Sequence, residues 1–502
     1  MTTMKKNKFY ITTSIAYTNA EPHIGYALEL IQADVLNRYH GLKGERTWFL
    51  TGTDEHGIKI ARAAQAHHRE PQVFVDEIAL KFEALPAMLN VANDDFIRTT
   101  DRSRHWPTPL KLWRILQENG DLYKKDYEGF YCVGHEAFIK KSELVDGVCP
   151  IHKTAPELVR EQNWFFKVSK YRQEIKRKIE KDELKILPVS KKNEILNLLD
   201  DAEDVSVSRP ARSLSWGIPV PDDPSQTMYV WVDALSNYIS ALGWDHDSEE
   251  FKTFWPADVH LIGKDILRFH AMIWPAILLS AGIDLPKAIY VHGFITVDGE
   301  KMSKSIGNVI DPAVIAEKYT PDVVRYFLLR EIPSDEDGDF SEKKLIARYN
   351  GDLANGLGNL TSRIVTLIDK NLDAELIYKE NFVDANVALK ISEIADTYQR
   401  TIGNFKFHET LAAIWELISF TDKYMNDRKP WAEASTNAEG FLTTMTNLVM
   451  LLHNVSRMLL PFMPQTAERV MNVLGIEPGI DPVENFKFAV TKTAGIFPRI
   501  EG

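Results

Sequence analysis

The sequence predicts an α/β protein: a parallel β-sheet domain interrupted by an insertion and followed by an all-α helical bundle. Three observations predict this. Strands and helices alternate up to about residue 120 and again from 227 to about 330, the stretch between them is aromatic, charged and irregular, and the chain beyond about 350 is almost wholly helical. Alternation is typical of parallel sheets, because parallel strands need crossover connections. With 502 residues, the chain should hold about two to four domains.

The first predicted strand and helix meet at a corner that carries a histidine and a glycine. Residues 8–17 mix β-branched and aromatic side chains as a buried strand does, and apolar side chains recur at helical spacing from Ile24 to Tyr39. His23 and Gly25 therefore lie at the step from strand to helix. A helix N-terminus at the carboxyl edge of a parallel sheet presents free N–H groups and the positive end of the helix dipole, which suits a phosphate.

A second segment, residues 291–307, carries two lysines, two serines and flanking glycines between a strand and a helix that opens at Asp311-Pro312. Lys301 and Lys304 are three residues apart on this loop and could close over a polyphosphate. Taken alone, such a loop is more often solvated surface, and a single histidine before a helix is more often an N-terminal hydrogen bonder.

Composition narrows the class of protein. A net charge of −12 argues against a protein that coats nucleic acid through bulk positive charge, although local basic patches remain compatible with a specific nucleic-acid substrate. Two cysteines exclude a disulfide scaffold and fit a reducing compartment. The N-terminus forms no signal-peptide core, and the most apolar run, Ala271 to Ile283, is too short to span a bilayer. We therefore expect a cytoplasmic protein without a membrane segment.

The two phosphate-type segments together resemble the signatures of class I aminoacyl-tRNA synthetases: Pro-His-Ile-Gly at 22–25 and Lys-Met-Ser-Lys-Ser at 301–305. The resemblance implies a Rossmann-like catalytic domain in which His23, Lys301 and Lys304 act on ATP with Mg²⁺, while an amino-acid carboxylate attacks the α-phosphate. Tyr26 stands where the family usually has a second histidine. Its hydroxyl donates one hydrogen bond but carries no positive charge near neutral pH, so we expect a weakened contribution rather than loss of activity.

The resemblance extends over essentially the whole chain and narrows to the methionine-specific members of the family. It is carried by residues 15–19, 51–57, 229–238 and 261–270, with Trp274 and the lysine loop. By that match the methionine-binding residues would be Ile15, Ala16, Tyr17, Asp54, Trp231, Ala234, Leu235, Tyr238, Phe269, His270 and Trp274. Aromatic walls suit a polarisable thioether, and Asp54 would hold the ammonium group. The simpler alternative is a pair of amphipathic core helices with ordinary aromatic packing.

The same match assigns the nucleotide. The residues implied to bind ATP are Pro22, His23, Gly25, Tyr26, Gly263, Asp265, Lys301, Ser303 and Lys304. Gly263 and Asp265 would lie at a strand end, with Asp265 hydrogen-bonded to the ribose.

The insertion contains two Cys-x₂-His pairs, Cys132 with His135 and Cys149 with His152, separated by 13 residues. Thiolate and imidazole form a tetrahedral zinc set, and four protein ligands leave no open position for catalysis. We therefore expect a structural Zn²⁺. Relatives in the family often carry a zinc knuckle here, and others have lost the metal, so the alternative is an inherited knuckle that is empty.

Residues 359–363 and 429–431, in the helical C-terminal part, resemble the segments with which the family reads the CAU anticodon. Asn359 and Arg363 lie four residues apart on one helix face, and Trp431 follows Pro430 and offers a ring on which a base can stack. Without the family, the simpler interpretation is a helix N-terminus and a core tryptophan. The chain ends soon after Ile500, without the C-terminal dimerising domain of some relatives, so we expect a monomer.

The resemblance implies a methionine–tRNA ligase of protein synthesis, which forms methionyl-adenylate and then charges initiator and elongator tRNA(Met). The expected domains are a catalytic domain in two halves (1–120 and 226–290), a connective insertion (121–225), a lysine-loop and stem-contact region (291–350) and a helical anticodon-binding domain (351–502).

Three alternatives stay open. A synthetase for leucine, isoleucine or valine would need a far longer insertion for its editing domain. A tRNA-binding protein that lost catalysis has Tyr26 as its only hint. A nucleotidyltransferase without tRNA is disfavoured by the anticodon-type segment.

Overall fold

The computed structural model describes residues 7–132, 137–139, 141, 144–150, 153–302, 307–492 and 495–500. The chain divides into two compact units, each discontinuous in sequence. Unit 1 comprises Met1–Pro22, Glu45–Pro86 and Asn93–Val291, and unit 2 comprises His23–Gly44, Ala87–Ala92 and His292–Gly502.

A seven-stranded sheet organises unit 1, in the order β2-β3-β1-β13-β14-β8, with β4 paired to β3. The strands are β1 Lys8–Thr13, β2 Ala16–Tyr17, β3 Arg46–Asp54, β4 Asp95–Arg98, β8 Lys185–Leu187, β13 Val259–Gly263 and β14 Ala288–His292. The pairs of β1 with β3 and β13, of β3 with β2 and β4, and of β8 with β14 are parallel. The predicted parallel sheet is thus confirmed.

Helices of unit 1 bury their apolar faces either against this sheet or in a smaller cluster of their own. They are α2 Ile58–Ala66, α3 Pro71–Met88, α4 Pro107–Glu118, α5 Val168–Glu180, α6 Val189–Asp200, α7 Val230–Leu235, α8 Asn237–Ser240, α9 Glu249–Phe254 and α10 Trp274–Ala281. One hydrophobic cluster runs from Tyr10 and Leu50 of the central strands to Trp113 of α4 and Trp274 of α10. Burial of this apolar surface is the main force that holds the layers together.

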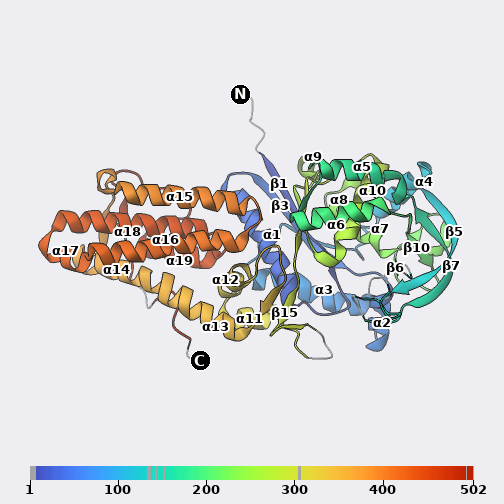
Figure 1. The fold of residues 1–502 in the computed structure, drawn as a ribbon, viewed down its shortest axis with the longest axis horizontal. Helices are drawn as coiled ribbons and strands as arrows, with labels where there is room; N and C mark the ends of the chain where they lie inside the picture. The colour runs from blue at the N-terminus through green and yellow to red at the C-terminus, as the bar shows by residue number, and fades with distance from the viewer. Residues whose placement is uncertain are drawn as a thin grey trace, which may run out of the picture. The chain divides into compact units, whose positions relative to one another are not determined.

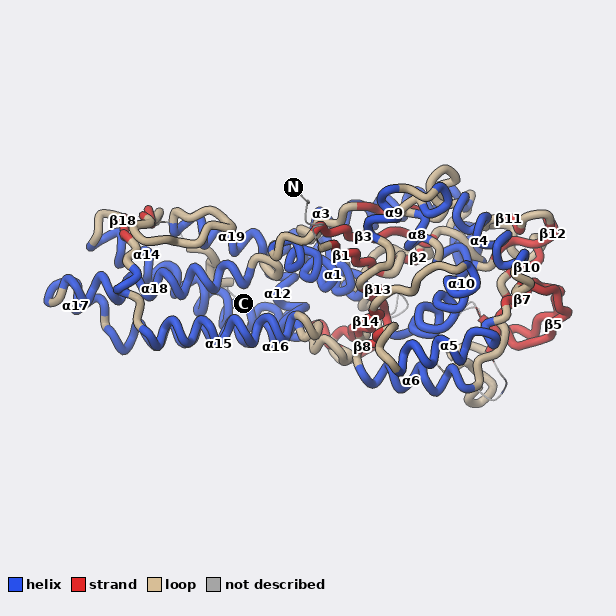
Figure 2. Tube along the Cα trace, turned by 90° about the horizontal axis from the view of Figure 1, so that it is seen from above, coloured by secondary structure: helices blue, strands red, loops and turns tan. Residues whose placement is uncertain are grey.

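A second, antiparallel layer lies in the region predicted as the insertion. Strands β5 Leu122–Cys132 and β7 Glu157–Phe166 form a long pair, flanked by β6 Ala137–Ile139 and β9 Val205–Ser206, and Figure 2 shows β5 and β7 side by side near β10–β12. A smaller sheet contains β10 Ser208–Pro210, β11 Pro219–Val220 and β12 Asp223–Met228. Strand β8 lies within the same stretch of sequence but pairs with β14 of the main sheet.

Unit 2 begins with α1 Ile24–Leu42 and continues from a small sheet of β15 Ile295–Val297, β16 Glu300–Lys301 and β17 Gly338–Phe340 into helices. These are α11 Pro312–Tyr319, α12 Pro321–Glu331, α13 Glu342–Arg348, α14 Asn359–Asn371, α15 Ala385–Ile402, α16 Phe407–Arg428, α17 Pro430–Thr436, α18 Ala438–Leu459 and α19 Pro464–Leu474. Helices α14, α15, α16, α18 and α19 form the bundle seen in Figure 1. The predicted helical C-terminal part is confirmed.

A buried ion pair ties α1 to the helical part within unit 2. Arg325 of α12 lies 2.6 Å from Asp34 of α1, and both side chains are fully buried. The same guanidinium donates to the carbonyls of Pro461 and Phe462 at 2.8 Å each, just after α18. A buried charge is tolerated only when it is paired and hydrogen-bonded, and Arg325 meets both conditions. Helix α1 is therefore fixed against α12 and the end of α18.

Candidate active site

The corner predicted at the start of the chain exists, and its histidine caps a helix. His23 is exposed, has an extended backbone, and accepts a hydrogen bond from the Gly25 N–H at 3.1 Å through Nδ1. A Cβ on Gly25 would stand 3.0 Å from the His23 ring, so a larger residue would push the imidazole away. Tyr26 is buried, with 7% of its surface exposed. The imidazole is thus held at the positive end of a 19-residue helix.

The lysine loop meets this corner within unit 2. The Ile24 N–H donates to the Ile310 carbonyl at 3.1 Å, and the Met302 methyl lies 3.8 Å from where a Cβ on Gly25 would stand. Lys301 is exposed at the end of β16. Ser303 and Lys304 lie outside the described residues. The described ends of the loop therefore bring the lysine segment beside the histidine corner.

The remaining nucleotide residues lie in unit 1. Gly263 ends β13 and is buried, and Asp265 is exposed in the short helical turn that follows, Lys264–Ile266. Pro22 is partly exposed at the boundary of unit 1. These positions agree with the expectation of a strand end for Gly263 and Asp265.

All eleven residues predicted to bind methionine belong to unit 1. Ile15, Ala16 and Tyr17 lie in or next to β2, Asp54 ends β3, Trp231, Ala234 and Leu235 lie on α7, Tyr238 on α8, Phe269 and His270 on the π-helical turn Phe269–Ile273, and Trp274 begins α10. Trp231 and Phe269 stack with ring centroids 3.4 Å apart and planes 9° apart. The sheet register places Tyr17 beside Asp54.

The hydrogen bonds of His270 define its protonation. Its Nδ1 lies 3.0 Å from the Ile266 carbonyl, which can only accept, so Nδ1 carries the proton. Its Nε2 lies 2.7 Å from the Tyr238 hydroxyl and therefore accepts from it when the ring is neutral. Burial lowers the pKa of His270 to about 4, so the ring is neutral near pH 7. The predicted pocket thus contains a neutral histidine and a tyrosine whose proton points to it.

Three residues of the pocket segments have no role that the sequence predicts: Glu55, His56 and Asp233. Glu55 is fully buried, and its carboxylate accepts two hydrogen bonds from Arg98, of 2.7 and 2.8 Å. Asp233 is buried between His56 and His105; burial alone would raise the pKa of its carboxyl, but the two imidazoles lower it to about 2. The only signal in the sequence was their position inside conspicuous motifs.

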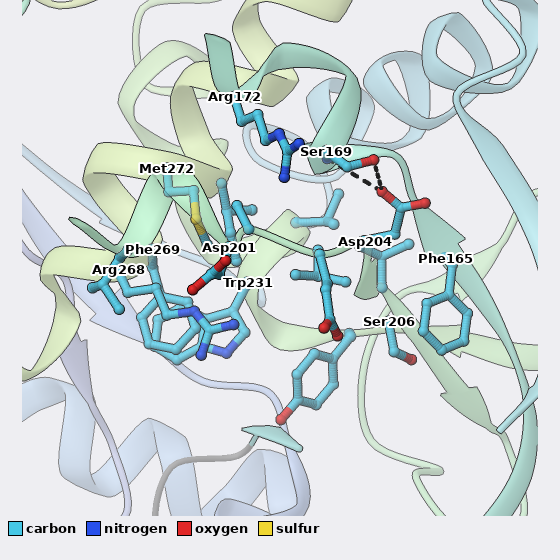
Figure 3. A pocket seen from close by; sticks show the side chains of 18 of the residues that line it. Phe165, Ser169, Arg172, Asp201, Asp204, Ser206, Trp231, Arg268, Phe269 and Met272 are labelled. Carbon is cyan, nitrogen blue, oxygen red and sulfur yellow. Dashed lines mark hydrogen bonds between the residues drawn. The ribbon is translucent and has the colours of Figure 1, made fainter. Parts of the chain in front are cut away.

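A cavity of about 790 Å³ lies beside the predicted methionine residues in unit 1. Figure 3 shows Trp231, Phe269 and Met272 on one side of it and Phe165 and Asp204 toward the other. Asp204 accepts a hydrogen bond from the hydroxyl of Ser169 at 2.6 Å, and both residues line the cavity. Of the predicted methionine residues, only Trp231 and Phe269 line this cavity.

The predicted anticodon residues lie on two helices that contact each other, α14 and α17. Asn359 is exposed at the start of α14, and Trp431 is 50% exposed on α17. Arg363 donates to Asp422 at 2.6 Å and to Asn426 at 2.9 Å. At this exposure Trp431 is not a core tryptophan, which was the simpler interpretation of the sequence.

The predicted zinc site is only half described. Cys132 at the end of β5 and Cys149 are both buried, whereas His135 and His152 lie outside the described residues. Within the described ranges, no group of three or more His, Cys, Asp or Glu side chains is placed to hold a metal ion. The burial of both cysteines is compatible with a structural metal site. In the described part of the chain, no helix has the length and apolarity to cross a membrane.

Comparison with known proteins defines the family. The model of the class I tRNA synthetases (M) matches residues 9–155 and 139–365, and the model of the anticodon-binding domain of tRNA ligases matches residues 384–488. The methionine–tRNA ligase of Thermotoga maritima is 44% identical over 490 residues, which cover 95% of this chain and 77% of that protein. The enzyme of Brucella suis biovar 1 is 40% identical over 97% of this chain and 94% of its own length.

Solved structures similar to this chain belong to the same family as these relatives. The structure of Mycobacterium tuberculosis methionyl-tRNA synthetase in complex with methionyl-adenylate is 38% identical, has a TM-score of 0.93, and covers 98% of this chain and 100% of that one. The apo form of the same enzyme has a TM-score of 0.86 and 35% identity over the full length of both chains. The fold and the matching motifs define a class I tRNA synthetase, and this chain belongs to its methionine–tRNA ligase family.

Proposed function

We propose that this chain ligates methionine to tRNA in two ATP-dependent steps. A carboxylate oxygen of methionine attacks the α-phosphorus of ATP, the bond from that phosphorus to the bridging oxygen breaks, and pyrophosphate leaves with the electron pair. The terminal ribose hydroxyl of tRNA(Met) then attacks the carbonyl carbon of the adenylate. An ester forms and AMP leaves. Initiator and elongator tRNAs are both substrates, and the product serves protein synthesis.

The observation that carries the proposal is the meeting of the histidine corner and the lysine loop. The Ile24 N–H donates to Ile310, and Met302 approaches Gly25, so His23 and Lys301 belong to neighbouring segments. In such transfers the protein mainly positions groups and neutralises developing negative charge. His23, Lys301 and Lys304 supply donors and positive charge to the phosphates, and Mg²⁺ bound with ATP adds further positive charge.

The other nucleotide contacts follow from the positions of the residues. Gly263 lets the backbone approach the nucleotide at the end of β13, and the exposed carboxylate of Asp265 accepts from the ribose. Pro22, Gly25, Tyr26 and Ser303 complete the set that we assign to ATP.

Methionine binding uses one carboxylate and an aromatic wall. Asp54 pairs with the ammonium group at the end of β3, beside Tyr17. The stacked rings of Trp231 and Phe269 face the thioether, and each contact of sulfur with a ring contributes roughly 0.3–1.5 kcal/mol. Tyr238 and the neutral His270 supply the polar end of the pocket.

We assign recognition of the tRNA anticodon to Asn359, Arg363 and Trp431. The half-exposed Trp431 ring offers a stacking platform. Arg363 would exchange its partly exposed ion pair with Asp422 for a base, which costs little because such pairs are weak.

We assign a structural Zn²⁺ to Cys132, His135, Cys149 and His152. The burial of both cysteines supports this assignment, because a zinc knuckle encloses its thiolates. The metal would hold the end of β5 to the following turns and would take no part in the chemistry.

We further propose that the chain acts as a monomer in the cytoplasm, and that its domains follow the boundaries predicted from the sequence. The catalytic halves are 1–120 and 226–290, the insertion is 121–225, the lysine-loop and stem-contact region is 291–350, and the anticodon-binding domain is 351–502.

The test of the function is methionine-dependent exchange of pyrophosphate into ATP, measured on the natural protein and on Tyr26→His. We expect the natural protein to catalyse this exchange, because His23 is held at the N-terminus of α1. The second histidine of the signature is then not required. If only Tyr26→His exchanges, the natural chain is a tRNA binder that has lost catalysis. If neither exchanges, the amino-acid assignment is wrong.

A further inference from the structure

A buried carboxylate beside the predicted methionine pocket is bound by two imidazoles. Oδ2 of Asp233 lies 2.6 Å from Nδ1 of His56, and Oδ1 lies 2.7 Å from Nε2 of His105. The three side chains are 1%, 3% and 0% exposed, in the same order. A carboxylate can only accept hydrogen bonds, so each ring nitrogen that faces it carries a proton.

The three residues come from separate segments of unit 1. His56 follows β3, two residues after Asp54; Asp233 lies on α7, between Trp231 and Ala234; and His105 precedes α4. The other ring nitrogen of His105, Nδ1, lies 2.9 Å from the hydroxyl of Ser240, at the end of α8. The network therefore joins the segment that carries the predicted ammonium ligand to the helices that carry the predicted side-chain wall.

The segment that contains Asp54 is fixed at several further points. The Tyr17 hydroxyl donates to the His56 carbonyl at 3.0 Å, and Trp216 donates to the Glu55 carbonyl at 2.6 Å. The His56 ring also meets Trp216 edge-on, with centroids 5.5 Å apart. Tyr17 is itself a predicted methionine residue, so both the backbone and the side chain of His56 connect to the pocket.

A buried ionic network costs free energy, because its charged groups are removed from water. Well-packed apolar groups of similar volume are often as stable as a buried charge network or more stable, so a stability role alone does not account for it. A fully satisfied polar network does, however, fix the relative positions of the elements it joins. Here those elements are the end of β3 and the start of α7.

We propose that Asp233, through His56, is a positioning residue for methionine: it sets the spacing between the carboxylate of Asp54 and the aromatic wall on α7. The inference rests on the proposed function, because it concerns the amino-acid half of the same site. The network contains no residue of the lysine loop or the histidine corner. We therefore expect a change in the binding of methionine and no change in the binding of ATP.

The test compares Asp233→Asn with the natural protein in the pyrophosphate exchange assay, with methionine and ATP titrated separately. The amide keeps the shape, but its NH₂ group donates and cannot accept, so one of the two imidazole N–H groups loses its acceptor. We expect the KM for methionine to rise about tenfold or more, as a loss of about 1.4 kcal/mol in binding would give, with the KM for ATP unchanged. The control is Asp258→Asn, which removes a carboxylate of unit 1 that binds Lys8 and Lys287 just before β13, at the end of this strand opposite Gly263. It should lower stability without changing the KM for methionine.

A matched pair at His56 tests the same network without altering the carboxylate. His56→Asn keeps a side-chain N–H near the position of Nδ1 and should retain most methionine affinity, whereas His56→Leu removes the donor and should raise the KM as Asp233→Asn does. This pair decides the matter if Asp233→Asn does not fold. An unchanged KM for methionine, equal changes for both substrates, or equal behaviour of the His56 variants overturns the inference. A natural protein without exchange overturns the proposed function itself.

Discussion

The hydroxyl of Tyr238 donates to Nε2 of His270 at 2.7 Å, and the proton on Nδ1 of the same ring is held by the Ile266 carbonyl. Both side chains are buried, with 1% and 3% of their surfaces exposed. The pair therefore has one arrangement of protons near neutral pH, and the polar end of the predicted methionine pocket is fixed before substrate enters.

Tyr238→Phe should leave Nε2 of His270 buried without its donor. We expect the free energy of unfolding to fall by about 1–3 kcal/mol and the KM for methionine to rise. Urea unfolding and pyrophosphate exchange measure the two effects. Tyr326→Phe is the control, since its hydroxyl binds Asp352 in unit 2; it should reduce stability and leave the KM unchanged. Equal methionine kinetics in both variants would contradict the assignment of Tyr238.

Stability should fall as the pH falls below 6.5, because His270 is buried in its neutral form. Burial lowers the pKa of this imidazole to about 4, whereas in the unfolded chain it is near 6.5. Between these values the unfolded state binds the extra proton, so the contribution of His270 is complete above pH 6.5 and is lost toward pH 4.

The contribution of His270 to the free energy of unfolding should fall by about 2 kcal/mol between pH 7.5 and pH 5. His260 and His453 are also buried with lowered pKa values and act in the same direction. Urea unfolding of the natural protein and of His270→Asn at both pH values isolates the share of His270. Identical pH dependence in the two proteins would show that His270 does not titrate as its burial requires.

Lys304→Ala should slow formation of the adenylate. Loss of one preorganised positive group at the phosphates is expected to lower kcat for pyrophosphate exchange by about 10²-fold or more, with the KM for methionine unchanged. Lys343→Ala, at an exposed position of α13, controls for the loss of one positive charge. Normal exchange kinetics in Lys304→Ala would refute the role of the lysine loop.

Trp431→Ala should separate tRNA charging from amino-acid activation. A base stacked on an aromatic ring contributes about 1–3 kcal/mol, so the KM for tRNA(Met) should rise by roughly 5- to 150-fold while exchange stays normal. Leu389→Ala, which removes another exposed apolar side chain of the bundle, should change neither. Equal losses of exchange and charging in Trp431→Ala would show a structural defect and sink the anticodon assignment.

Metal analysis tests the zinc site directly. The purified protein is expected to contain about one Zn²⁺ per chain, and Cys149→Ser should lose it, since four ligands complete a structural site. Ser435→Ala, on the exposed surface of α17, should keep it. Exchange activity should persist after metal loss as long as the insertion stays folded. A natural protein purified with zinc in the buffer but without bound metal would identify the knuckle as empty.

The sequence predicted the organisation of the fold well, because its signals are local. Helical periodicity from Ile24 to Tyr39 corresponds to α1, and the helical chain predicted beyond about 350 contains α15, α16 and α18. Asp311 caps α11, as its position before Pro312 suggested. The pairing of β8 with β14 was not predicted, because strand partners are chosen by non-local packing and no single segment records them.

The sequence by itself determined the family, the order of elements and the candidate residues, because short motifs and residue spacing are written along the chain. Only the tertiary structure decided which of those residues meet. Asp233 binds His56 and His105 across 177 and 128 residues of sequence, and α1 joins the same unit as the C-terminal helices through Arg325 and Asp34. The physical reason is that such contacts form when buried polar groups must find partners in a packed core, and packing selects partners by shape and position rather than by separation along the chain.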